Sequence, residues 1–257
     1  MAAPFSCHPP STMPFSISSH WRVAREPRYS LTFALPLLVA YEVLAFALSH
    51  DEVTGVRNGA DVLLKSLFLG MGGRDGLIVF GALLLGGGAW LVWQDYRRWR
   101  TLDSRVFGMM AAESVVYALA FGMVTSSLTG LLLPGLGTIL SLGWVASWSL
   151  PTQLMISLGA GIYEELLFRV ILVSALAWIA RRGLSWNVTT SSIFAVVVGA
   201  LIFSAFHYIG PYGDRLELGS FAFRAVAGVL FSGLYLLRGF GITAWTHALY
   251  DVFLALR

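Results

Sequence analysis

Long apolar stretches recur along the chain and are separated by short polar segments. Stretches long enough to cross a bilayer occur at 31–49, 76–93, 106–133, 152–180, 188–209, 218–237 and 240–256. Because about 20 predominantly apolar residues span the hydrocarbon core as a helix, this pattern predicts an all-α protein. We expect a polytopic transmembrane helical bundle.

Two further segments do not fit the simple pattern. Residues 56–72 carry Arg57, Asp61 and Lys65 at roughly helical spacing, which favours an amphipathic helix lying on the membrane surface. Residues 134–150 are apolar, uncharged and bounded by prolines, so they form either a re-entrant hairpin or one more short span. The pattern therefore predicts seven or eight spans.

The composition supports a membrane protein and excludes several other classes. Hydrophobic residues make up 57% of the chain, charged residues 12%, and the mean hydropathy is +0.73. Soluble domains carry about 25% charged residues. No run of Lys and Arg resembles a nucleic-acid surface, so the expected surroundings are lipid and not nucleic acid. The single cysteine, Cys7, excludes an intramolecular disulfide and a thiol nucleophile inside the membrane.

The termini and charges suggest an orientation. Residues 1–30 form a polar tail without the apolar core of a signal peptide, with a short interfacial segment around Trp21. On a seven-span arrangement, ten Lys and Arg residues fall on the side of the N-terminus and five on the other. The positive-inside rule then places the N-terminus in the cytoplasm.

Five acidic residues lie inside the apolar stretches: Glu42, Glu113, Glu164, Glu165 and Asp251. Each costs about 2.5–3.5 kcal/mol at the centre of a membrane helix. The isolated Glu42 and Glu113 are explained if they are protonated or hydrogen-bonded within the bundle. The adjacent pair at 164–165 roughly doubles the cost and needs a further explanation.

Helix geometry separates the two members of this pair. Glu165 and Arg169 are four residues apart, so they share a face and form an ion pair. Glu164 lies about 100° round the helix, beside Ser157 and Gly161, and has no local cation. Glu164 is therefore the candidate for proton transfer.

Two histidines accompany Glu164 in later spans. His207 ends the run Phe203–His207, and His247 stands four residues before Asp251, on the same side of its helix. Glu164 and His247 lie at similar depth, whereas His207 is shallower unless its helix ends short of the surface. Such a set can polarise a water molecule and hold an oxyanion, or it can bind a divalent metal such as zinc.

The three motifs Glu-Glu-x-x-x-Arg (164–169), Phe-x-x-x-His (203–207) and His-x-x-x-Asp (247–251) resemble those of a known family. In this order on three of the predicted spans, they are similar to the CAAX-protease and bacteriocin-processing (CPBP, or Abi) family of intramembrane proteases. The resemblance covers about 150–257. It implies an accessory set of transmembrane helices at 31–150 and a catalytic core at 151–257.

The resemblance also implies roles for the candidate residues. Glu164 and His207 would activate the attacking water, and His247 with the residue at 251 would stabilise the oxyanion. Glu165, Arg169 and Phe203 would support them. The prenyl-protein branch usually carries Asn at the last position, where this chain has Asp251, as the broader bacterial family also does.

The resemblance leaves the role of Asp251 and of any metal open. A carboxylate cannot donate a hydrogen bond to an oxyanion unless it is protonated. Asp251 is therefore expected to orient His247, to help bind a metal or to be protonated. Either Glu164, His207, His247 and Asp251 hold a divalent metal, or the reaction is metal-free.

The predicted function is that of an intramembrane endopeptidase acting on a membrane-tethered or prenylated protein or peptide, in a bacterial inner membrane. Neither a His-Glu-x-x-His nor a Gly-x-Ser-x-Gly motif occurs, and the second motif of aspartyl intramembrane proteases is missing. The alternatives are a proton-coupled transporter, for which no internal repeat is found, and a non-catalytic family scaffold or immunity protein.

Overall fold

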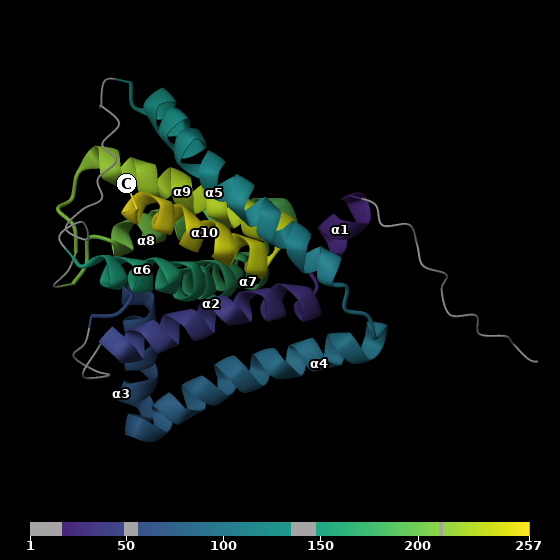
Figure 1. Cartoon of the computed structure of the whole chain (residues 1–257). Coiled ribbons are helices and arrows are strands. Elements are labelled where there is room, and N and C mark those ends of the chain that lie inside the picture. The colour runs from purple at the N-terminus through teal and green to yellow at the C-terminus, as the bar shows by residue number, and fades with distance from the viewer. Residues whose placement is uncertain (1–16, 49–55, 135–147, 211–212, 257) are drawn as a thin grey trace, which may run out of the picture.

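The computed structural model describes residues 17–48, 56–134, 148–210 and 213–256, and within these ranges the chain forms helices and turns but no strand. In chain order (Figure 1) the elements are α1 (Ile17–Val23), α2 (Pro27–Leu48), α3 (Gly59–Gly81), η1 (Ala82–Gly86), α4 (Gly87–Trp99), α5 (Ser104–Leu132), α6 (Leu150–Gly159), η3 (Ala160–Val173), α7 (Ser174–Gly183), α8 (Val188–Phe206), α9 (Leu218–Arg238) and α10 (Phe240–Ala255). The elements η1 and η3 are π-helical. The predicted all-α bundle is confirmed.

Five helical stretches are long and apolar enough to cross a membrane: Pro27–Leu48, Gly59–Trp99, Ser104–Leu132, Val188–Phe206 and Leu218–Arg238. The protein is therefore an integral membrane protein. The other two predicted spans, 152–180 and 240–256, are also helical. The first is divided among α6, η3 and α7, and the second corresponds to α10, which has only 16 residues. The count of seven or eight spans stays a prediction.

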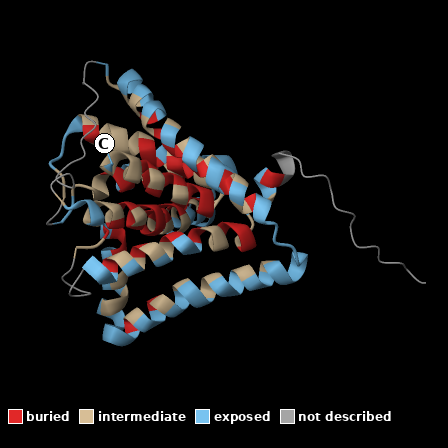
Figure 2. Cartoon of the chain, viewed as in Figure 1, coloured by how far each residue is buried: buried red, intermediate tan, exposed pale blue. Residues whose placement is uncertain are grey.

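The last helix lies in the middle of the bundle. α10 packs against α2, α5, α6, η3 and α9, and Figure 2 shows buried residues concentrated in these central helices, with exposed residues along α4. Because protein surrounds α10 on several sides, its polar side chains need not face lipid.

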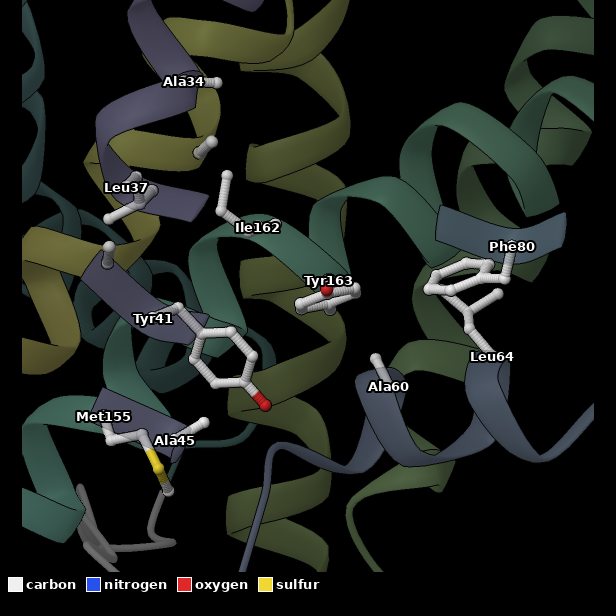
Figure 3. Packing of buried hydrophobic residues seen from close by; sticks show 12 residues of the cluster. Ala34, Leu37, Tyr41, Ala45, Ala60, Leu64, Phe80, Met155, Ile162 and Tyr163 are labelled. Atoms are coloured by element: carbon white, nitrogen blue, oxygen red, sulfur yellow. The ribbon is translucent and has the colours of Figure 1, made fainter. Parts of the chain in front are cut away.

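A cluster of buried apolar residues joins α2 and α3 to η3. Tyr41 from α2 and Tyr163 from η3 meet edge to face with ring centroids 5.3 Å apart, and Ala60 from α3 belongs to the same cluster (Figure 3). α2 and α3 therefore pack directly on the helix that carries Glu164.

The helix predicted within 56–72 forms, and its polar side faces the protein; its placement on the membrane surface stays a prediction. Asp61 is fully buried and pairs with Arg57 at 2.7 Å and with Lys65 at 2.8 Å. Val62 and Leu67 are exposed instead. The polar side faces the protein because Glu42 on α2 supplies a partner for both cations, at 3.2 Å each.

A sharp break follows within α3. Gly72 and Gly73 leave helical geometry, and Gly73 adopts a positive φ of 59°, which glycine tolerates best. The chain folds back so tightly that a Cβ on Gly76 would lie 1.9 Å from the carbonyl oxygen of Phe68. This break separates the predicted polar helix from the following apolar stretch.

The N-terminal segment docks on the bundle through Arg238. The guanidinium of Arg238 donates to the Trp21 carbonyl at 3.0 Å and pairs with Glu113 at 2.5 Å. His20 also contacts Glu113, at 3.0 Å, and burial lowers the pKa of His20. The interfacial segment expected around Trp21 is thus α1, and Glu113 is hydrogen-bonded within the bundle, as predicted.

Two sequence predictions concern residues that are only partly described. Most of the 134–150 segment, namely 135–147, lies outside the described residues. Of the predicted tail 1–30, the described part begins at 17, and its last four residues already belong to α2. The domain boundaries at 30 and 150 stay predictions.

Candidate active site

The acidic pair lies on η3, the π-helical element in the middle of the bundle. Glu164 is 7% exposed and Glu165 is fully buried. A π-helix has wider turns than the α-helix assumed from the sequence, and such segments are frequent at functional sites. The expected ion pair is nevertheless present, since Nε of Arg169 lies 3.2 Å from Oε2 of Glu165.

Glu165 has a second partner that spacing did not reveal. Its Oε1 atom lies 2.7 Å from Nδ1 of His247 on α10. A carboxylate only accepts hydrogen bonds, so Nδ1 must carry the proton. Glu165 therefore neutralises Arg169 and orients His247 at the same time.

His247 is also held by its other neighbours. The Phe231 ring stacks on the imidazole with centroids 4.3 Å apart and an interplanar angle of 24°. Nε2 of His247 lies 3.6 Å from Oδ2 of Asp251. Of the two carboxylates, Glu165 makes the shorter contact with His247, although the sequence suggested that Asp251 would orient the ring.

His207 reaches the same region from the end of α8. The helix ends at Phe206, and Nδ1 of His207 donates to the Phe203 carbonyl at 2.9 Å. Its Nε2 atom lies 3.9 Å from Oε2 of Glu164. His207 therefore lies beside Glu164 in the folded chain, as the proposed pairing of the two requires.

The Phe203 ring packs against both His207 and Arg169. The centroid of this ring lies 4.9 Å from the centroid of the His207 ring. The same centroid lies 4.3 Å from Cζ of the Arg169 guanidinium. The guanidinium over the ring face is a cation–π contact. Phe203 thus separates the Glu165–Arg169 pair from His207.

The four predicted site residues line one cavity of about 230 Å³. They are Glu164, His207, His247 and Asp251. The other walls come from α5, α6, α9 and α10 and include Phe121, Gln153, Ser157, Ser220, Phe223, Arg224, Tyr250 and Leu254. The structure therefore brings together residues that are more than 80 positions apart in the chain. Their catalytic roles stay predictions.

Sequence analysis missed Arg224, a cation that lines this cavity. It donates to the Tyr208 hydroxyl at 2.9 Å and forms an ion pair with Asp214. A single arginine inside the apolar stretch 218–237 was a usable signal, because charged residues within such stretches commonly mark functional sites.

Sequence analysis also missed Asn58, which precedes α3. Its Nδ2 atom donates to Oε1 of Glu164 at 2.8 Å, and Asn58 is 3% exposed. No motif in the sequence indicates this contact, because 106 residues separate the two.

The donor atoms of the predicted metal set lie around the same cavity. In the part of the chain that the structure describes, no group of three or more His, Cys, Asp and Glu side chains is arranged to hold a metal ion. Glu164 and His247 each spend one donor atom on a protein partner, Asn58 and Glu165 respectively. Such contacts also occur in metal sites, where a ligating histidine donates its other ring N–H to a carboxylate, so the predicted metal set stays a prediction.

The chain was compared with known proteins. Residues 146–253 match the family model of the type II CAAX prenyl endopeptidase Rce1-like proteins. This match agrees with the family resemblance that the three motifs predicted. The matched region includes the four predicted site residues and Arg224. It does not include Asn58 or the helices before α6. Comparisons with curated proteins and with solved structures gave no match.

Proposed function

We propose that the protein is an intramembrane endopeptidase that hydrolyses a peptide bond with a water molecule activated by Glu164 and His207. The family match supports a CAAX-type endopeptidase in general terms. The alternatives of a transporter or a non-catalytic scaffold have no comparable support in the geometry.

The observation that carries the proposal is the pair of atoms Oε2 of Glu164 and Nε2 of His207, 3.9 Å apart. Because Nδ1 of His207 donates to the Phe203 carbonyl, Nε2 of the neutral ring is an acceptor. Oε2 of Glu164 has no hydrogen-bond partner among the described residues. Two acceptors at this spacing suit one water molecule, which can donate a hydrogen bond to each.

The reaction follows from these positions. The water oxygen attacks the carbonyl carbon of the peptide while Glu164 takes one proton from the water. The tetrahedral oxyanion then accepts a hydrogen bond from Nε2–H of His247, whose imidazolium form is flanked by Glu165 and Asp251. Cleavage of the C–N bond transfers the proton from Glu164 to the leaving nitrogen, which gives a carboxylic acid and an amine. The acid then passes its remaining proton to the amine, so the final products are a carboxylate and an ammonium group.

The proposed reaction is metal-free and its substrate is a membrane-tethered or prenylated protein or peptide. The cavity combines the polar groups of the site with apolar walls such as Phe121, Phe223 and Leu254. Such walls suit the lipid-like or apolar part of a tethered substrate. We further propose a bacterial inner membrane as its location.

The test uses the purified protein in liposomes with two peptides of one sequence, one farnesylated and one anchored by a transmembrane segment. We expect Glu164→Gln to lower kcat/KM at least about 100-fold, because general-base catalysis contributes roughly 10²- to 10⁴-fold. The variant should remain folded, and the wild-type rate should survive a chelator.

The matched control is Glu217→Gln, which changes an exposed glutamate outside the cavity. Its rate should equal that of the wild type. Cleavage by the Glu164→Gln variant at the wild-type rate would contradict the mechanism. Preference for one of the two peptides identifies the tether that the cavity accepts.

A further inference from the structure

We propose that Asn58, in the chain segment before α3, is a positioning residue that holds Glu164 in its reactive orientation. This inference rests on the proposed function. It assigns a role at the site to the part of the chain that lies outside the family match.

The orientation of the Asn58 amide is determined by its two contacts. The side-chain oxygen caps α3 by accepting from the Ala60 backbone N–H at 2.9 Å. The amino group is therefore the atom that faces Glu164, and it donates to Oε1 at 2.8 Å. Exchanging the two amide atoms would break both hydrogen bonds.

The backbone at Asn58 is supported by a buried polar network. The Asn58 N–H donates to the Tyr41 hydroxyl at 3.3 Å, and that hydroxyl donates to Asp61 at 2.7 Å. Asp61 is fully buried and pairs with Arg57 and Lys65. Two helices and an ion-pair cluster thus set the position of one amide.

Asn58 reaches Glu164 because α6 presents a glycine at the crossing point. A Cβ on Gly159 would lie 2.7 Å from Cβ of Asn58 and 2.5 Å from Cε2 of Tyr41. Only a residue without a side chain allows this approach. The contact is therefore built into the packing of α2, α3 and α6.

The consequence concerns the second oxygen of Glu164. With Oε1 bound to Asn58, Oε2 is the atom that faces His207 at 3.9 Å, and it has no other partner in the described segments. A fixed N–H donor on Oε1 also stabilises the ionised carboxylate, which is the form that accepts a proton. Asn58 thus selects which oxygen meets the water.

The decisive variant is Asn58→Asp, which keeps an oxygen for the Ala60 N–H but replaces the donor with an acceptor. We expect kcat to fall about 10- to 100-fold, as for a misplaced catalytic group, while KM changes less than about twofold. The control is Asn187→Asp, because Asn187 caps α8 on Thr190 in the same way but is exposed and outside the cavity.

A stability measurement tests the contact without activity. In Asn58→Asp two carboxylates face each other, and adding Glu164→Gln supplies an amide donor again, so the double variant should unfold at a higher temperature than Asn58→Asp alone. Additive effects of the two substitutions, or an Asn58→Asp enzyme with wild-type kcat, would overturn the inference. Thermal coupling in a protein whose wild type cleaves neither peptide would support the contact and overturn the proposed function.

Discussion

At the scale of single residues, the carboxylates inside the membrane differ in how their charge is balanced. Glu42 pairs with Arg57 and Lys65, Glu113 with Arg238, and Glu165 with Arg169. Among the described side chains, no lysine or arginine pairs with Glu164, which contacts Asn58 and His207 instead. Glu164 therefore keeps an oxygen available for chemistry, whereas the paired glutamates stabilise the bundle.

This difference predicts stability losses of very different size for the two adjacent residues. Glu165→Gln leaves Arg169, which is 1% exposed, without a counter-ion, and we expect a loss of about 3–5 kcal/mol in the free energy of unfolding. Glu164→Gln leaves no arginine or lysine without its counter-ion, so it should lower the free energy of unfolding far less. Denaturant unfolding in detergent compares the two. Equal stability losses would contradict the assignment of Glu165 as the structural carboxylate.

At the scale of helices, the site depends on close packing between η3 and α10. A Cβ on Gly161 would lie 2.4 Å from the Ala244 carbonyl oxygen and 2.7 Å from Cβ of Ala248. This approach brings Glu165 within hydrogen-bond distance of His247. Small residues at helix crossings have this function in membrane proteins generally.

We therefore expect Gly161→Ala to separate η3 from α10, which lowers both the melting temperature and the cleavage rate. The physical reason is steric, because the neighbouring atoms belong to backbone or to a short side chain and cannot rotate away. Gly233→Ala on α9 is the matched control, since a Cβ there meets nothing within 4 Å. A Gly161→Ala enzyme as stable and active as this control would show that the approach is not required.

At the scale of the whole molecule, several arginines lie at one end of the bundle and the cavity lies nearer the other end, although Arg224 lines the cavity. The last turns of α4 and α7 carry arginines, and Arg238 ends α9 at the end where α1 docks (Figure 1). The cavity walls come from the first turns of α6 and α9 and the last turn of α10. With the positive-inside rule, we predict that the cavity faces away from the cytoplasm.

This orientation is tested at the two ends of α8. In a Cys7→Ser background, Leu216→Cys should react with a membrane-impermeant maleimide in intact cells, and Leu184→Cys only after lysis. Both leucines are more than half exposed, at 72% and 52%. The reverse labelling pattern would place the cavity on the cytoplasmic side, where prenylated tails are made accessible.

The sequence by itself determined the features that arise from local spacing. The apolar stretches predicted the helical membrane bundle, and the four-residue spacing predicted the Glu165–Arg169 ion pair. The motifs around Glu164, His207 and His247 also predicted the family whose model matches residues 146–253. These features depend on periodicity along one helix, which sequence encodes directly.

Only the tertiary structure decided which partner each polar group meets. The hydrogen bonds from Tyr41 to Asp61, from His247 to Glu165 and from Asn58 to Glu164 all join separate parts of the chain. They depend on how closely the helices approach at Gly159 and Gly161. Hydrophobic periodicity does not specify these distances, because a membrane helix is apolar on the faces that meet lipid and on those that meet protein.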